Sequence, residues 1–181
     1  MGIGNTIRGD DGIGIYIAEE IKKKLVNKKN NVTVISTETA GLNLLDLIVG
    51  YSKLIIVDSI QVSSNNELGH MFELEVNQLS SSNGHFNSHD IDFSKLFKIG
   101  KKLKIKLPKE IKIYGIGIFF VKEFGQKCNL QLGKMIPDIA QCIINKELSL
   151  EEQIEQYKKD CLIMIIAKRK PLKDILRYTN Y

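Results

Sequence analysis

The sequence predicts one α/β domain of three layers, in which helices cover both faces of a central sheet. Short apolar runs alternate along the chain with segments whose apolar residues recur at helical spacing. Runs such as residues 54–57 are continuously apolar, which is typical of parallel strands buried on both faces. The length of 181 residues also favours one domain over two.

The elements of the first half follow from these patterns. A glycine-rich opening leads into a helix over 12–26, whose apolar stripe includes Ile13, Ile17 and Ile21. Residues 32–36 are mostly β-branched and predict a strand, and 39–50 predict a second helix. The apolar strand over 54–57 ends at Asp58. Alternation over 70–76 predicts an edge strand, and the short turn at 63–66 predicts an antiparallel hairpin with the strand before it.

The second half continues the same alternation. After a polar loop over 79–88, Asp90 or Asp92 is expected to cap a helix that runs to about residue 103. Residues 111–118 predict a strand, 119–130 an irregular segment, and 132–147 a helix. We therefore expect a domain over 1–147 and a C-terminal helical appendage over 148–181. The apolar run at 162–167 fits a strand and a buried helical turn equally well.

Composition excludes several classes of protein. With 43% hydrophobic and 26% charged residues, the chain is typical of soluble globular proteins. No apolar run approaches the roughly 20 residues that a membrane-spanning helix needs, and no secretory signal is visible, so a cytoplasmic protein is expected. The net charge of +5 comes almost entirely from lysine, which does not favour nucleic-acid readout. The three cysteines form no CxxC pair and are expected as free thiols.

The opening segment, residues 2–14, contains five glycines and the adjacent acids Asp10 and Asp11. A phosphate-binding GxGxxG loop would need glycine at position 7, where Ile7 stands. Carboxylates at the start of a helix repel phosphate and suit a metal cation. They also suit helix capping, but one acid suffices for that role, so the second acid needs another explanation.

Other candidate ligands are Asp58 and His89. The carboxyl ends of strands form the ligand crevice of an open α/β sheet, and the opening loop leaves the sheet at that same edge. Asp58 is therefore expected to approach Asp10 or Asp11, a choice that spacing leaves open. His89 precedes a predicted helix and is the histidine most suited to a metal site. Each of these residues alone would fit a structural role.

These motifs resemble the hydrogenase maturation endopeptidases. The resemblance covers most of residues 1–147 and rests on the segments 2–14, 38–41, 54–59, 88–93 and 114–117. It implies a three-layer α/β/α sandwich with a twisted, mostly parallel sheet and one antiparallel strand. It also implies that Asp11, Asp58 and His89 contact the metal. Because the family has about five residues before the glycine motif, the first strand is expected to be truncated.

The resemblance further implies a function. The protein would remove the C-terminal extension of a nickel-hydrogenase large-subunit precursor after nickel loading, with the nickel supplied by the precursor. Water would attack the peptide bond, with Asp10 or Asp58 as a candidate general base. The alternative is a non-catalytic, metal-sensing maturation chaperone of the same fold. A nucleotide-binding protein is disfavoured by the failed glycine pattern. We expect a monomer that binds no nucleic acid.

Overall fold

The computed structural model describes residues 1–26, 31–39, 41–74, 93–119 and 128–148. Five strands and four α-helices lie in this part of the chain, together with short 3₁₀ turns. The strands are β1 (Gly2–Ile3), β2 (Ser36–Thr37), β3 (Lys53–Gln61), β4 (Met71–Leu74) and β5 (Glu110–Ile118). The helices are α1 (Ile13–Leu25), α2 (Leu44–Ile48), α3 (Phe93–Lys102) and α4 (Leu130–Glu147). The 3₁₀ turns are η1 (Gly9–Gly12), η2 (Gly41–Asn43) and η3 (Asn65–Glu67).

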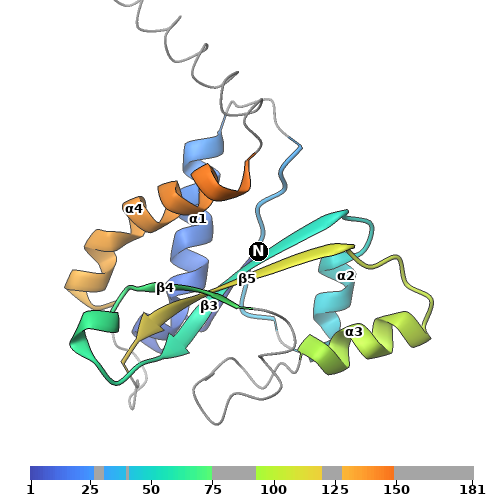
Figure 1. Cartoon of the computed structure of the whole chain (residues 1–181), viewed down its shortest axis with the longest axis horizontal. Helices are drawn as coiled ribbons and strands as arrows, with labels where there is room; N and C mark the ends of the chain where they lie inside the picture. Colours follow the sequence, from blue (N-terminus) through green and yellow to red (C-terminus); the bar gives the residue numbers. More distant parts are fainter. Residues whose placement is uncertain (27–30, 40, 75–92, 120–127, 149–181) are drawn as a thin grey trace, which may run out of the picture.

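The strands form one mixed sheet in the order β2-β1-β3-β5-β4. The pairs β1–β2, β1–β3 and β3–β5 are parallel, and β4 is antiparallel to β5. Helices cover both faces: Figure 1 shows α1 and α4 on one side of the sheet and α2 and α3 on the other. The predicted α/β class, mostly parallel with one antiparallel strand, is confirmed.

Two apolar clusters hold these layers together, one on each face of the sheet. Alternate residues of a strand point to opposite faces, so Val57 packs with α1 and α4 while Ile56 packs with α2 and α3. Tyr114 and Ile113 divide in the same way on β5. The central strands β3 and β5 are apolar on both faces because both faces are covered. Among the described residues, no helix is both long enough and apolar enough to cross a membrane.

The predicted hairpin between β3 and β4 is wrong, although β4 is antiparallel as expected. β5 pairs with β3 over nine residues, from Lys53↔Glu110 to Gln61↔Ile118, and β1 occupies the other edge of β3. β5 thus takes one edge of β3 along its whole length, and β1 with the opening loop lies along the other. β4 therefore crosses to the outer edge of β5, where the Gly69 N–H donates to the Gly117 carbonyl over 2.8 Å.

The predicted elements over 32–36 and 39–50 are shorter than expected. Only Ser36 of the first range lies in β2, because β1 offers two residues for pairing. The second range contains the 3₁₀ turn η2 and five residues of α2. The helices over 12–26 and 132–147 and the strand over 111–118 agree with α1, α4 and β5. The capping acids at 90 and 92, and residues 149–181, lie outside the described residues.

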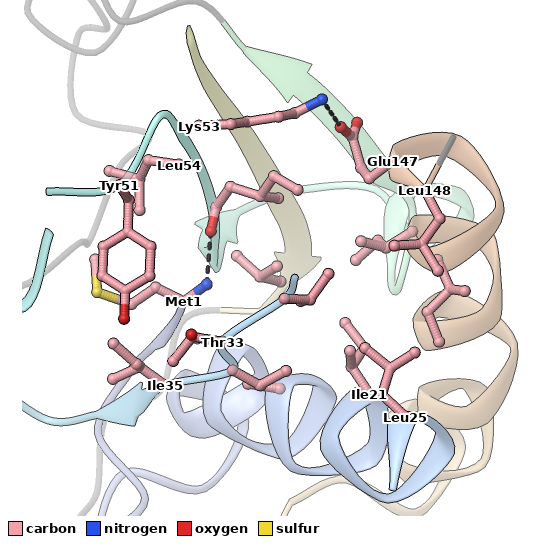
Figure 2. A pocket seen from close by; sticks show the side chains of 18 of the residues that line it. Met1, Ile21, Leu25, Thr33, Ile35, Tyr51, Lys53, Leu54, Glu147 and Leu148 are labelled. Carbon is pink, nitrogen blue, oxygen red and sulfur yellow. Dashed lines mark hydrogen bonds and ion pairs between the residues drawn. The ribbon is translucent and has the colours of Figure 1, made fainter. Parts of the chain in front are cut away.

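A cavity of about 330 Å³ adjoins the short strand β1, between residues 31–35 and 52–55 (Figure 2). The Met1 amino group donates to the Ile55 carbonyl over 2.6 Å, and burial lowers the pKa of this amino group to about 6. On the far wall, Glu147 at the end of α4 forms an ion pair with Lys53 of β3. This cavity lies at the amino ends of the strands, away from the candidate active site.

Candidate active site

The opening loop leaves the sheet after β1 and returns through η1 into α1. The Asn5 side chain accepts a hydrogen bond from the Ile7 N–H at 3.0 Å, and the Asn5 N–H donates to the Asp11 carbonyl at 3.2 Å. Gly9 adopts a φ of 59°, in the left-handed region that glycine favours. The loop is thereby folded back on itself, so that Asp10 and Asp11 both lie in η1.

The other glycines of this segment allow close packing of backbone on backbone. A Cβ atom at Gly4 would lie 2.4 Å from the Asp11 carbonyl oxygen. A Cβ atom at Gly14 would lie 2.3 Å from the carbonyl oxygens of both Ile3 and Val57, so glycine lets α1 approach β1 and β3. The glycine pattern thus has a packing role, which accounts for it without a bound phosphate.

Asp58 lies within β3 and not at its end, so the predicted strand boundary is wrong. β3 continues to Gln61, because residues 58–61 keep pairing with β5. Gly2 is paired with Val57, and β1 ends one residue later, so the opening loop departs beside Asp58. The expected crevice therefore lies at the carboxyl end of β1, against the middle of β3.

Ser59 connects the two acidic side chains that face this crevice. Its hydroxyl donates to Oδ1 of Asp11 at 2.8 Å, and its backbone N–H donates to Oδ1 of Asp58 at 2.8 Å. Each of these three residues is at most 2% exposed. They are the buried polar or charged residues of the described part of the chain. Asp11 also has the Arg8 guanidinium 3.8 Å from its Oδ2.

Burial raises the pKa of the Asp58 carboxyl well above its ordinary value of 3.8. The hydrogen bond from the Ser59 N–H opposes this rise, and the negative charge of Asp11 adds to it. The Oδ2 atom of Asp58 is buried and has no hydrogen-bond partner among the described residues. Such an oxygen is available to a proton or a cation.

Asp10 points to a different part of the structure from Asp11. Its Oδ1 accepts a hydrogen bond from the Asn129 N–H at 2.5 Å, just before α4 begins. The nearby thiol of Cys128 has a pKa raised to about 12 by burial and by the charge and hydrogen bonding of Asp10. A thiol with this pKa is a poor nucleophile at neutral pH, which agrees with the inert free thiol that the sequence predicts.

The structure thus brings Asp11 to Asp58 and Ser59, and separates Asp10 from them. His89 lies outside the described residues, and no group of three or more His, Cys, Asp or Glu side chains that could hold a metal is found within the described ranges. The metal-contacting role of Asp11, Asp58 and His89 therefore stays a prediction.

Sequence reasoning missed Ser59 and the residue that anchors the opening loop. Glu38 accepts hydrogen bonds from the backbone N–H of Thr6 at 3.1 Å and from its hydroxyl at 2.5 Å. A serine inside an otherwise apolar strand, directly after an acid, was the available signal for Ser59. No local pattern connects Thr6 with Glu38, which lies 32 positions away.

Comparisons with known proteins agree on one family. The family model for hydrogenase maturation proteases matches residues 15–146, a range that includes Asp58 and begins just after Asp11. A Methanocaldococcus jannaschii protein, provisionally named as a hydrogenase maturation protease, is 29% identical over 101 residues. That match covers 54% of this chain and 63% of the relative, so it spans less than two thirds of the relative's length.

Solved structures show the same fold. The hydrogenase maturating endopeptidase HybD from Escherichia coli has a TM-score of 0.61 at 22% identity, covering 80% of this chain and 88% of that one. The [NiFe] hydrogenase maturation protease HycI from Thermococcus kodakarensis has a TM-score of 0.60 at 18% identity, covering 80% and 87%. Because the family model covers well over half of the chain, this protein belongs to the hydrogenase maturation protease family.

Proposed function

We propose that this protein is an endopeptidase that removes the C-terminal extension of a nickel-hydrogenase large-subunit precursor after nickel has been loaded. Two observations support the proposal: the family to which the chain belongs, and two buried carboxylates held side by side through Ser59. The second carries most weight, because two acids in a water-poor crevice favour the binding of a cation there.

The nickel ion belongs to the substrate in this proposal. Asp11 and Asp58 contact it through carboxylate oxygen, and His89 supplies an imidazole nitrogen. These donor types bind first-row transition metals. Burial, with a further contribution from the charge of Asp11, raises the pKa of Asp58, and a dication at the carboxylates would favour their charged forms. Precursor without nickel would lack this interaction, so the site would test maturation before cleavage.

Cleavage itself is proposed to use water as the nucleophile. A general base works best when its pKa lies near the working pH, and a nickel ion on Asp58 would lower the pKa of that carboxyl. The Asn129 N–H holds Asp10 away from Asp58 and Ser59. The general base therefore stays open between Asp58 and Asp10.

We also expect a cytoplasmic location, a monomeric state and no binding of nucleic acid. We further expect a functional domain over 1–147, followed by an appendage over 148–181. None of them is needed for the proposed reaction.

The proposal is tested by incubating the protein with nickel-loaded and with nickel-free large-subunit precursor, and following the precursor's mass. Shortening of the loaded form alone is expected. The variant His89→Ala should abolish processing, while the matched control His70→Ala, on an exposed histidine of the β4 edge, should leave it intact. Nickel-dependent binding with no shortening of either form would favour the chaperone alternative and reject the peptidase.

A further inference from the structure

We propose that the last turns of α3 and the connection to β5 form a docking surface for an acidic face of the precursor. The inference rests on the proposed function, which supplies the protein partner. Residues 93–109 contain seven lysines and no acidic residue. Six of these lysines, all exposed, define what we call the basic surface: Lys98, Lys101, Lys102, Lys104, Lys106 and Lys109.

The lysines of the basic surface form no ion pair with an acid in the described part of the chain. Lysines of other elements do form such pairs: Lys23 lies 3.5 Å from Glu20, and Lys112 lies 3.3 Å from Glu147 and 3.7 Å from Glu73. Unpaired charges of one sign repel one another and disfavour the compact state. Such a concentration of positive charge is suited to a partner that brings negative charge.

The backbone at Lys104 is strained where α3 ends. Lys104 has a φ of 56° and is the one non-glycine residue with a positive φ among those that the structure describes. The Ile105 N–H donates to the Gly100 carbonyl at 3.0 Å, and the Lys104 N–H donates to the Lys101 carbonyl at 3.1 Å. These bonds form a Schellman motif, whose left-handed position glycine usually occupies. A lysine at this position favours a role for its charge.

The chemistry of the basic surface favours an acidic protein over other anionic partners. Leu96 and Phe97 bury the apolar side of α3 in the core, so the helix has no free apolar face to insert into a lipid surface. Residues 98–109 contain no arginine and no aromatic residue, the types that nucleic-acid binding favours. Leu103 is 63% exposed among the lysines and offers an apolar contact that a protein partner can bury.

The basic surface lies away from the crevice but within reach of the same partner. Figure 1 shows α3 with α2, on the side of the sheet away from α1 and α4. Beyond α3, the Lys109 N–H donates to the Ser52 carbonyl at 2.9 Å, at the amino end of β3. The ten residues of α3 span about 15 Å, and a standard protein interface covers about 800 Å² on each partner. One precursor can therefore contact both places.

The distance between the basic surface and the crevice determines which kinetic constant should change. Residues that contact only the bound partner contribute equally to the ground state and the transition state. Their loss raises KM and leaves kcat unchanged. Because the contacts are between exposed charges, salt should weaken them.

The experiment measures the affinity of the 181-residue chain for nickel-free precursor, and KM and kcat for nickel-loaded precursor, at about 50 mM and about 500 mM NaCl. The triple glutamate variant, Lys98→Glu with Lys101→Glu and Lys102→Glu, should weaken binding and raise KM about tenfold or more at low salt. Its kcat should stay within about twofold of the wild type. The wild-type affinity should fall with salt, and the affinity of the variant should fall less.

Two further variants separate charge from folding. A triple arginine variant at the same three positions keeps the charge and should keep the affinity within about twofold. Lys104→Gly relieves the backbone strain and removes one charge, so it should raise Tm while weakening precursor binding about twofold or more. A merely structural role for Lys104 predicts no loss of binding in this more stable variant.

The matched control changes the same amount of charge on the other face of the sheet. Lys22, Lys23 and Lys24 lie in the last turn of α1, as Lys101 and Lys102 lie in the last turn of α3. Replacing the three α1 lysines by glutamate should change KM less than about twofold. Thermal unfolding of both triple variants shows whether each is folded, and if the α3 variant is not, glutamine replaces glutamate at its three positions.

The outcomes separate the inference from the proposed function. Unchanged affinity and KM in the triple glutamate variant, an equal loss in the α1 control, or no binding of either precursor by the wild type would each overturn the inference. Lysine-dependent binding to vesicles of phosphatidylcholine and phosphatidylserine, without an effect on the precursor, would also overturn it. Lysine-dependent binding of a precursor that is never shortened would support the docking surface and reject the peptidase.

Discussion

Replacing the buried acid at the end of α4 should destabilise the fold in a pH-dependent way. The Glu147 side chain is only 3% exposed, and its carboxylate lies 2.9 Å from Lys53 Nζ and 3.3 Å from Lys112 Nζ (Figure 2 draws the Lys53 pair). The Tyr114 hydroxyl also donates to it. Glu147→Gln keeps the size of the side chain and removes its charge.

The size of the stability loss depends on how far each partner of these ion pairs is buried. Removing one member of a fully buried ion pair costs roughly 3–5 kcal/mol. Lys53 and Lys112 are 33% and 34% exposed, so water can solvate the ammonium groups that lose their partner. We therefore expect a loss of about 2 kcal/mol in the free energy of unfolding at neutral pH, and a fall in Tm of about 4–8 °C.

The sign of the pH dependence follows from the pKa of Glu147. Burial raises this pKa, but hydrogen bonds from Tyr114, Lys53 and Lys112 outweigh burial, so it lies below its ordinary value of 4.5. Such a group stabilises the fold above the unfolded-state pKa, and the contribution is lost as pH falls through the folded-state pKa. The difference between wild type and Glu147→Gln should therefore shrink below about pH 4.5.

The assay is urea unfolding of both proteins across this pH range. The matched control is Glu73→Gln, because Glu73 pairs with Lys112 and Lys146 but is 51% exposed, and it should change stability by no more than about 0.5 kcal/mol. Equal effects of the two substitutions, or a Glu147→Gln deficit that persists undiminished in acid, would refute the reasoning.

Further outcomes follow from other contacts. Gly14→Ala should lose about 3 kcal/mol or more, because its Cβ would lie 2.3 Å from two backbone oxygens, whereas Gly133→Ala, with nothing within 4 Å, should be neutral or stabilising by about 1 kcal/mol in urea unfolding. Because the pKa of Asp58 is raised on folding, its protonated form is favoured in the fold and its charged form destabilises the fold. The stability that depends on the protonated form is present below pH 3.8 and is lost as pH rises through the folded-state pKa. Asp58→Asn should therefore raise Tm relative to wild type at about pH 8 and bring no gain near pH 3.8; a gain that is independent of pH would contradict this. Cys128, with a pKa of about 12, should react with iodoacetamide at pH 8 more slowly than the exposed Cys142, as peptide mass spectrometry can measure.

Sequence patterns were sufficient where the determinants are local. The apolar stripes of α1 and α4 and the continuous run of β5 predicted these elements, because burial of one face or both leaves its own periodicity. The meeting of the opening loop with Asp58 was predicted from the carboxyl ends of parallel strands, but it occurs beside the middle of β3, because the short strand β1 ends there.

Other features depend on contacts between distant residues. Asp10 and Asp11 differ only because the Asn129 N–H, 119 positions away, binds Asp10. β4 pairs with β5 and not with β3 because β5 occupies the edge of β3 over nine residues. The hydrogen bond from the Ser59 N–H to Asp58 depends on where β1 ends, because β1 stops at Ile3 and pairs with β3 at Gly2↔Val57. No pattern within a short window of sequence contains this information.

The most direct test of the proposed metal recognition is anomalous diffraction at the nickel edge from crystals of the 181-residue chain grown with Ni²⁺. We predict one peak within coordination distance of an oxygen of Asp11, Oδ2 of Asp58 and a nitrogen of His89. A peak bound through Asp10, or none near the Asp11–Ser59–Asp58 group, would contradict the account.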